Sequence, residues 1–240
     1  LFESGRCQRC VLIDDGGLLT EEWNRLNEKG YDTISVQQTA SGFSRAPHVP
    51  VRRVDVARSA AKRFFEARII AAGVFRKVKE LHVLRETKNV GVVGMGYVGR
   101  AIATELARRG KTVYAYDKRP GRTVLGCQNV AHWSDCIRNA DFIFGCTGTD
   151  FMGQSGLRWL GAVGEKHLAS LSSRDIEFQG LLRHGHPLER AGKFGLVKVS
   201  YRGAGPFLIM NGGFPVNFDR EAEWESDEAI SLTRGLVLLG

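Results

Sequence analysis

Short apolar runs alternate with amphipathic stretches through the middle of the chain. The run at 89–93 has the length of a buried strand, and the amphipathic stretch over 98–109 that follows it ends at Gly110. Further apolar runs of strand length lie at 113–117, 142–144 and 168–171. Buried strands that alternate with helices are typical of a parallel sheet covered by helices on both faces. The pattern predicts an α/β fold whose main part is a doubly wound parallel sheet of the Rossmann type.

The part of the chain before this region predicts a smaller α/β lobe. We expect a helix over 21–28 with Thr20 as its N-cap, and strands at 11–13, 33–36 and 51–56. A long helix is expected from 59 to about 85 as a connector, because apolar residues recur there every three or four positions. We expect its phenylalanines to lie in the core, namely Phe64, Phe65 and Phe75.

The part after this region has a weaker pattern. The apolar runs at 196–199 and 207–210 predict two strands of a closing hairpin. A final helix is expected to begin at Ser226. No internal repeat or low-complexity tract accompanies these elements, so the prediction stays with one large fold and one smaller lobe.

Composition is that of a globular protein, and it narrows the class of partner. Of the 240 residues, 43% are hydrophobic and 25% charged, which excludes disorder, collagen-like repeats and a small disulfide-stabilised fold. The net charge is +8, but the basic residues are scattered without interleaved aromatic residues, so a solvated surface is favoured over a nucleic-acid interface. No apolar run reaches the ~18 residues of a membrane-spanning helix, so we expect no membrane partner.

The five cysteines are dispersed along the chain, which favours a reducing, cytoplasmic compartment. Cys7 and Cys10 form a CxxC pair, but no second pair and no nearby histidine pair completes a zinc site, so no metal is predicted. The chain begins at Leu1 and stops inside an apolar run at Gly240. These ends indicate a piece of a longer protein.

A glycine-rich turn carries the clearest chemical signal. The GxGxxG pattern follows a strand and opens a helix, and it reads Gly94-Met95-Gly96-Tyr97-Val98-Gly99. Glycines at these positions permit a tight turn, the approach of a pyrophosphate, and close packing of helix on strand, while the helix N-terminus offers N–H groups to the phosphates. Asp117 ends the next strand and can accept hydrogen bonds from ribose hydroxyls, which favours NAD over NADP. Lys118 and Arg119 leave NADP open, because an arginine there can hold a 2′-phosphate.

Two polar turns follow the next predicted strands. Cys146, Thr147 and Gly148 come after 142–144, and Ser172 follows 168–171. In a doubly wound sheet, the loops at the carboxyl ends of the strands line the ligand crevice. We therefore expect these residues to face the cofactor.

The stretch from 11 to about 217 resembles adenosylhomocysteinase, an enzyme that holds NAD and cleaves S-adenosylhomocysteine. Six landmarks occur in that family's order along the chain. They are an aspartate–glycine motif at 12–17, a polar loop at 37–42, a lysine motif at 54–66 that includes Ser59 and Lys62, the glycine fingerprint, Cys146-Thr147-Gly148, and Asp175-Ile176-Glu177.

The resemblance implies a cofactor domain inserted into a substrate domain. It implies a partial substrate-type lobe with a connector helix at 1–87, an NAD-binding domain at 88–200, and a segment that returns to the first lobe at 201–240. It implies that cofactor-domain contacts assemble an oligomer, and that a nucleoside-like small molecule is the ligand.

The resemblance also implies roles for single residues. Thr39 and Ser41 would reach the nicotinamide side, and Gly96, Tyr97, Val98 and Asp117 would hold the adenosine half. Thr147, Ser172 and Asn211 would lie along the nicotinamide. The candidates for catalysis are Lys62 beside the oxidised hydroxyl, together with the acids Asp15 and Glu66.

The chain departs from that family mostly at positions that transfer protons. Gln38 replaces a glutamate, Glu66 and Ala67 replace an acid and an amide, and the late glycine-histidine-proline motif is missing. Ala71 and Ser173 replace a cysteine and a histidine. We therefore predict an NAD-binding domain of a larger protein without standard adenosylhomocysteine hydrolysis.

Two enzymatic alternatives stay open beside a pure binding module. One is an NAD-dependent oxidation of a nucleoside or its derivative. The other is a 2-hydroxyacid dehydrogenase, whose fingerprint region looks alike and which needs an arginine, an acid and a histidine around its substrate. Arg174 is the candidate arginine, but no histidine follows at a matching place near the C-terminus.

Overall fold

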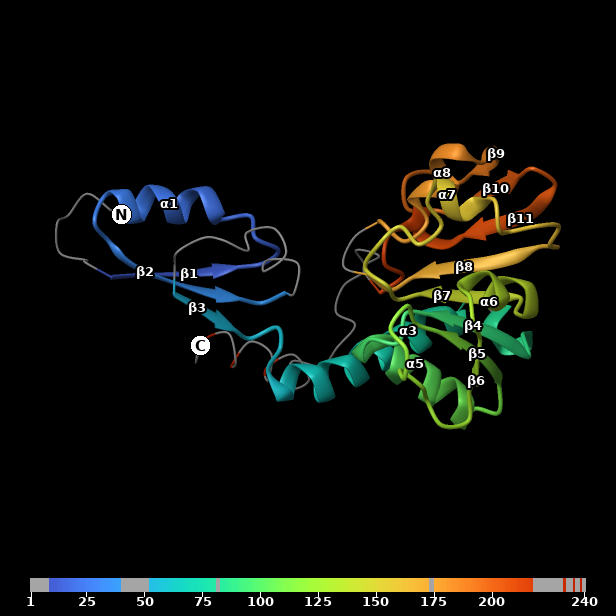
Figure 1. The fold of residues 1–240 in the computed structure, drawn as a ribbon, viewed down its shortest axis with the longest axis horizontal. Coiled ribbons are helices and arrows are strands. Elements are labelled where there is room, and N and C mark those ends of the chain that lie inside the picture. Colours follow the sequence, from blue (N-terminus) through green and yellow to red (C-terminus); the bar gives the residue numbers. More distant parts are fainter. Residues whose placement is uncertain are drawn as a thin grey trace. The chain divides into compact units, whose positions relative to one another are not determined.

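The protein is described from a computed structural model that divides the chain into two compact units. The described residues are 9–39, 52–80, 83–172, 175–217, 231, 235 and 238. Unit 1 comprises 1–66 and 225–240, and unit 2 comprises 67–224 (Figure 1). These units are compact parts of the fold and do not test the functional domains predicted from the sequence. Those predicted domains remain 1–87, 88–200 and 201–240.

Unit 1 contains a small parallel sheet with a crossover helix. Its elements are β1 (Arg9–Asp14), α1 (Thr20–Glu28), β2 (Asp32–Gln37), β3 (Arg52–Asp55) and a π-helix (Lys62–Glu66), and the strand order is β1-β2-β3. The helix buries Trp23 and Leu26, as an amphipathic crossover helix should. The strands end side by side, because Asp14 pairs with Gln37 and Gln37 with Asp55.

Unit 2 is built on a sheet of eight strands. The strands are β4 (Asn89–Val93), β5 (Thr112–Tyr116), β6 (Gln128–Asn129), β7 (Phe142–Gly145), β8 (Lys166–Ser170), β9 (His186–Arg190), β10 (Val197–Tyr201) and β11 (Ala204–Ile209). The helices are α3 (Ala67–Glu80), α4 (Val83–Glu86), α5 (Tyr97–Arg108), α6 (Trp133–Asn139), α7 (Gln154–Leu157), α8 (Gln179–His184) and a 3₁₀ turn (Met210–Gly213).

The strand order is β6-β5-β4-β7-β8-β11-β10-β9 (Figure 1). The first six strands in this order are parallel, and β10 and β9 extend the sheet in antiparallel fashion. The chain moves outward from β4 to β6 and then crosses back to β7, so the order reverses between β4 and β7. This is the doubly wound Rossmann arrangement, and it confirms the predicted fold class.

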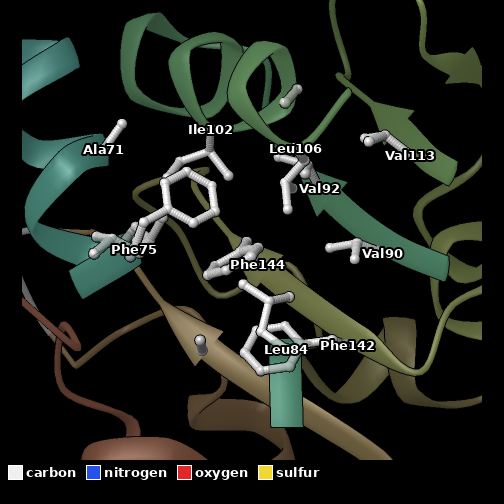
Figure 2. Packing of buried hydrophobic residues seen from close by; sticks show 14 of the residues in the cluster. Ala71, Phe75, Leu84, Val90, Val92, Ile102, Leu106, Val113, Phe142 and Phe144 are labelled. Atoms are coloured by element: carbon white, nitrogen blue, oxygen red, sulfur yellow. The ribbon is translucent and has the colours of Figure 1, made fainter. Parts of the chain in front are cut away.

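Two apolar cores cover the two faces of this sheet. One joins α3, α4 and α5 to the sheet, and the other joins α6, α7 and α8 to it. Figure 2 shows the first core, in which the Phe75 ring of α3 reaches toward Ile102 of α5 and Phe144 of β7. Because both faces are covered, the central strands are buried along their whole length, which explains their continuous apolar sequence.

The predicted long helix is interrupted. The chain is helical from 60 to 80, but 62–66 form a π-helical turn before α3 begins at Ala67. The expectation that three phenylalanines lie in the core is wrong for two of them, because Phe64 is 62% exposed and Phe65 57%. A π-turn shifts the face that each later side chain presents, so 3.6-residue spacing no longer identifies the buried side there.

The remaining differences concern ends of elements. Helix α1 begins at Thr20, with Leu19 rather than Thr20 at the N-cap position. The predicted hairpin is present as β10 and β11, and β11 also pairs with β8 as the sixth parallel strand. The final helix predicted from Ser226 begins outside the described residues.

Candidate cofactor site

The carboxyl ends of the central strands form one continuous edge. Tyr116 of β5 pairs with Val93 of β4, Val93 with Gly145 of β7, and Gly145 with Ser170 of β8. The residues that directly follow these strands therefore emerge along the same edge, at the place where the strand order reverses. This edge is where doubly wound sheets bind their ligands.

Two glycines of the fingerprint are required by the fold itself. Gly94 has φ +100°, and a Cβ there would lie 2.6 Å from the carbonyl oxygen of Cys146. A Cβ at Gly99 would lie 1.9 Å from the carbonyl oxygen of Gly94. No side chain fits at either distance, so Gly94 makes the turn beside the β7 loop and Gly99 lets α5 lie against the turn.

At Gly96, by contrast, no contact within the described protein requires a glycine. It is the N-cap of α5 with φ −69° and ψ −168°, a conformation open to any residue, and a Cβ there would meet nothing within 4 Å. The first turn of α5 contains no acidic residue, so its free N–H groups face no carboxylate from that turn. An open space before the N-terminus of a 12-residue helix fits a pyrophosphate. Tyr97 and Val98, the next residues, open the helix.

Asp117 lies beside the fingerprint turn, directly after β5. Its side chain is 7% exposed, and its Oδ2 atom accepts a hydrogen bond of 2.7 Å from the Met95 N–H. Arg119 donates its backbone N–H to Oδ1 at 2.8 Å. The guanidinium of Arg122 lies 3.6 Å from Oδ2, a contact that the sequence interpretation missed. Arg122 follows Arg119 after a Pro-Gly turn, so it could have been included among the basic residues near the acid.

The loops after β7 and β8 meet at the buried side chain of Glu177. The Thr147 hydroxyl donates to Glu177 Oε2 at 2.7 Å, and the Gly148 N–H donates to Oε1 at 2.7 Å. The Ser172 hydroxyl also donates to Oε1, and it accepts a hydrogen bond of 3.0 Å from the Gly148 N–H. The structure thus brings four predicted site residues, Cys146, Thr147, Gly148 and Ser172, around an acid that was not among the predicted site residues.

Burial dominates the titration of the ionisable groups at this edge. Burial raises the pKa of the Glu177 carboxyl, against the opposing effect of its hydrogen-bond donors. Burial also raises the pKa of the Cys146 thiol well above its usual range, and the charge of Glu177 adds to this effect. Cys146 therefore stays a neutral thiol at physiological pH, which does not suit a nucleophile.

Asn211 lies in the 3₁₀ turn (Met210–Gly213) that directly follows β11, so it emerges at the same edge of the sheet. Its backbone is left-handed, with φ 51°, and its side-chain amide donates to the carbonyl oxygen of Pro215 at 2.7 Å. An isolated bridge between Ser170 and Pro215 ties this loop to the end of β8. The structure thus holds Asn211 at the edge by side-chain and backbone contacts.

A second polar cluster lies in unit 1. Lys62 is 7% exposed, donates to the carbonyl oxygen of Gln38 at 2.5 Å, and forms an ion pair of 3.4 Å with Glu66. Burial raises the pKa of the Glu66 carboxyl, Lys62 opposes this rise, and the charge of Asp15 adds to it. The three residues predicted for catalysis therefore interact with one another.

This cluster continues into the ends of β1 and β2. Asp14 is fully buried and accepts a hydrogen bond of 3.0 Å from the Gln37 amide. The Gln37 Oε1 atom is buried and accepts no hydrogen bond from the described residues.

Three further residues were singled out from the sequence. Thr39 follows β2 in unit 1, and Ser41 and Arg174 lie outside the described residues. Among the described residues, no group of three potential metal ligands comes together. Within that same part of the chain, no helix has the length and apolarity to cross a membrane.

A comparison with protein families matches the core of unit 2. Residues 57–150 match the family described as D-isomer specific 2-hydroxyacid dehydrogenase, NAD binding domain. The matched stretch includes the fingerprint turn, Asp117 and the loop after β7, so the match covers the part of the edge formed by β4, β5 and β7.

Curated relatives of this chain have no described activity. An uncharacterized protein of Mycobacterium tuberculosis, found in two strains, is 30% identical over 241 residues. The alignment covers 98% of this chain and 45% of the relative, so the chain spans less than half of the relative's length.

Solved structures of dehydrogenases share the fold. The NAD-dependent formate dehydrogenase of Staphylococcus aureus, in complex with NAD, aligns at a TM-score of 0.50 with 14% identity, over 72% of this chain and 60% of that one. The apo D-lactate dehydrogenase of Escherichia coli aligns at 0.51 with 17% identity, over 74% and 64%. At these identities the likeness establishes the fold alone.

These findings overturn the resemblance to adenosylhomocysteinase, which was wrong. The family match and the solved structures point to D-isomer specific 2-hydroxyacid dehydrogenases instead. The error has a physical origin, because dinucleotide binding dictates the glycine turn, the acid after the second strand and the polar turn after the fourth. Motifs fixed by a shared cofactor do not separate the families that use it. Unit 2 contains an NAD-binding domain of the Rossmann type, and residues 57–150 are similar to the NAD-binding domain of D-isomer specific 2-hydroxyacid dehydrogenases.

Proposed function

We propose that this chain is the cofactor-binding part of an NAD-dependent oxidoreductase that acts on a small 2-hydroxy acid. The observation that carries the proposal is Gly96, where the fold leaves open the space that a pyrophosphate would fill. The match of 57–150 to the dehydrogenase family supports the substrate class. The nucleoside alternative lacks such support.

The residues of unit 2 divide between the two halves of the dinucleotide. Gly94, Gly96, Tyr97, Val98 and Gly99 would hold the pyrophosphate, and Asp117 the adenosine ribose. The second mononucleotide half of a doubly wound sheet lies over its later strands, β7, β8 and β11. The residues that follow them would therefore hold the nicotinamide half, namely Cys146, Thr147, Gly148, Ser172 and Asn211. Bound NAD would supply a hydride acceptor at this edge.

The cluster of unit 1 supports a role in substrate binding. The buried ammonium of Lys62 can bind a carboxylate or a hydroxyl oxygen, because it donates only to Gln38 and Glu66 among the described contacts. A carboxyl group with a raised pKa, such as Glu66, can accept or donate a proton at a hydroxyl of the substrate. We propose Lys62, Glu66 and Asp15 for these tasks, which concern unit 1 alone.

The proposal includes the setting of the protein. We propose a cytoplasmic protein with a small-molecule substrate, no nucleic-acid or membrane partner, and assembly as a homo-oligomer. The scattered basic residues and the cysteine usage support this setting.

The first experiment measures NAD binding by isothermal titration calorimetry of the purified chain. Gly96→Val fills the open space at the helix N-terminus, and we expect it to weaken NAD binding at least about tenfold. Gly164→Val is the matched control, because a Cβ there also meets nothing within 4 Å and the residue precedes β8, at the amino edge of the sheet. Equal NAD affinity for all three proteins would overturn the site.

A second experiment tests the reaction with a panel of 2-hydroxy acids and 2-keto acids, followed by the absorbance of reduced NAD. Lys62→Met is expected to lower turnover without changing the dissociation constant of NAD. Lys29→Met removes an exposed lysine of the same unit as the control. NAD binding without turnover of any acid would overturn the substrate class while leaving the cofactor site intact.

A further inference from the structure

Glu177 is a buried acid that has no role in the proposed function. Its side chain is fully buried, and it comes from the segment between β8 and α8. Among the described residues, no lysine, arginine or histidine forms an ion pair with it. A buried carboxylate without a nearby cation is costly unless hydrogen bonds or a ligand compensate it.

The hydrogen bonds of Glu177 all come from the two loops of the nicotinamide half. Oε2 accepts from the Thr147 hydroxyl and Oε1 from the Gly148 N–H, each at 2.7 Å, and the Ser172 hydroxyl donates to Oε1. Each donor directly follows β7 or lies just beyond the end of β8. One side chain thus joins two loops that the hydrogen bond between Gly148 and Ser172 also links.

The packing against Glu177 leaves it little freedom. A Cβ at Gly145, the last residue of β7, would lie 3.0 Å from Glu177 Oε2. The carboxylate therefore lies directly against the end of this central strand, underneath the loop that carries Thr147. A group held this firmly can set the position of a loop to within a fraction of an ångström, which ligand recognition requires.

We infer that Glu177 is the positioning residue of the nicotinamide half, and that its buried charge makes this half prefer oxidised over reduced NAD. The inference rests on the proposed function. The oxidised nicotinamide ring is cationic and the reduced ring is neutral, so a buried carboxylate at the edge that holds the ring attracts only the oxidised form. Charges interact strongly where water is excluded, because the effective dielectric constant there is low.

The test compares three ligands on the wild-type chain and on Glu177→Gln, by calorimetric titration. The glutamine keeps the size of the side chain and one acceptor but removes the charge. We expect the ratio of the dissociation constants of NADH and NAD⁺ to fall on the order of tenfold in this variant. The dissociation constant of ADP, which carries only the adenosine half and the pyrophosphate, should stay unchanged. Glu165→Gln, an exposed acid just before β8, is the control for the change in net charge.

The outcomes separate the inference from the proposed function. If the wild-type chain binds neither NAD⁺ nor ADP, both the proposed cofactor site and this inference are wrong. If it binds them and Glu177→Gln leaves the NADH to NAD⁺ ratio unchanged, the inference alone is wrong. A loss of ADP binding together with NAD⁺ would assign Glu177 a general structural role and would also overturn it.

A second pair of variants keeps the test decisive if Glu177→Gln fails to fold. Ser172→Ala and Thr147→Val each remove one donor and leave the charge in place. The inference then requires weaker binding of both NAD⁺ and NADH, by about five- to tenfold for one charge-assisted hydrogen bond, with their ratio and the ADP affinity unchanged. Unchanged binding of NAD⁺ in both variants would contradict it.

Discussion

At the scale of single residues, the glycines of one short motif have different physical tasks. Gly99 is a packing residue, since its Cβ would overlap the carbonyl oxygen of Gly94 at 1.9 Å, whereas Gly96 faces open space. Backbone atoms on both sides of the Gly99 contact leave no flexible side chain that could move away. Replacement by alanine should therefore change the free energy of unfolding by different amounts at the two positions.

Gly99→Ala is expected to lower the free energy of unfolding by about 3 kcal/mol, at the upper end of overpacking costs. Gly96→Ala should leave it within about 0.5 kcal/mol of wild type, as for substitutions that disturb no packing. Urea denaturation in the absence of NAD measures both. Equal stability of the two variants would show that α5 can move away from the turn, contrary to the packing argument.

The buried acid at the edge gives the protein a defined pH dependence. Burial raises the pKa of Glu177 above its usual value of 4.5, so between that value and the raised pKa the folded state keeps a proton that the unfolded state has released, and above the raised pKa the carboxyl is charged in both states. By linkage, this group lowers the free energy of unfolding as pH rises from about 4.5 through the raised pKa. Glu177→Gln removes the effect.

The difference in free energy of unfolding between Glu177→Gln and wild type should therefore shift in favour of the variant as pH rises through this window. Denaturant titrations at several pH values measure this difference, in which other titrating groups cancel. Glu165→Gln should show no such trend. A difference that stays flat with pH, or that moves toward wild type, would mean that the carboxyl keeps its ordinary pKa in the fold.

The sequence predicted those site residues whose role is fixed by local spacing. Gly94, Gly99 and Asp117 stand at set distances from a recognisable strand, so their places at the edge followed from the pattern. Glu177 could not be assigned in this way. Its partners Thr147 and Gly148 lie 30 and 29 residues away in the sequence, and only the folded sheet brings them together.

At the scale of elements, the segment 59–85 shows where periodicity ceases to be informative. A 3.6-residue repeat predicts one apolar face, but the π-turn at 62–66 rotates that face, so Phe65 is exposed whereas Phe75 in α3 is buried. The same turn accompanies the burial of Lys62, which the sequence alone placed on a helix without deciding its exposure. Single-residue insertions into a helical repeat are not visible in a hydrophobic pattern.

This difference predicts unequal effects for two phenylalanines ten residues apart. Phe75 packs in the core between α3, α5 and the sheet, with the Arg109 guanidinium 4.2 Å from its ring centroid. Phe75→Ala should lower the free energy of unfolding of unit 2 by about 3–5 kcal/mol, the cost of a large cavity. Phe65→Ala should cost less than about 1 kcal/mol.

Denaturation of the full chain, followed by tryptophan fluorescence, measures the two effects. Trp133 lies in the other core of unit 2 and Trp23 is buried in unit 1, so the fluorescence reports on the unfolding of both units. If Phe65→Ala proved as destabilising as Phe75→Ala, the π-turn would be absent in solution and the unbroken helix of the sequence prediction would be restored.

At the scale of the whole molecule, the sheet of unit 2 has two chemically different edges. The carboxyl edge gathers the glycine turn, the acid after β5 and the Glu177 network, whereas the amino edge carries short turns such as Gly110 and Gly164, where a Cβ would meet nothing. The strand alternation predicted this polarity, because parallel strands place all their carboxyl ends together. The hydrophobic pattern predicted β10 as a strand of a hairpin but did not predict β9, which is exposed along its length and lies outside the βα repeat.

NAD should therefore protect the two edges unequally in hydrogen exchange. At a concentration about 100-fold above its dissociation constant, a ligand adds about 2.7 kcal/mol to the stability of the folded state. Loop amides exchange through local opening, so they gain protection only where the ligand holds the loop. Amides at 94–99, 146–148 and 172 should slow markedly on addition of NAD, while those at 110–112 and 163–165 keep their rates. Because both sets belong to the same sheet, a general tightening of unit 2 would slow both sets equally and would contradict a cofactor site at the carboxyl edge.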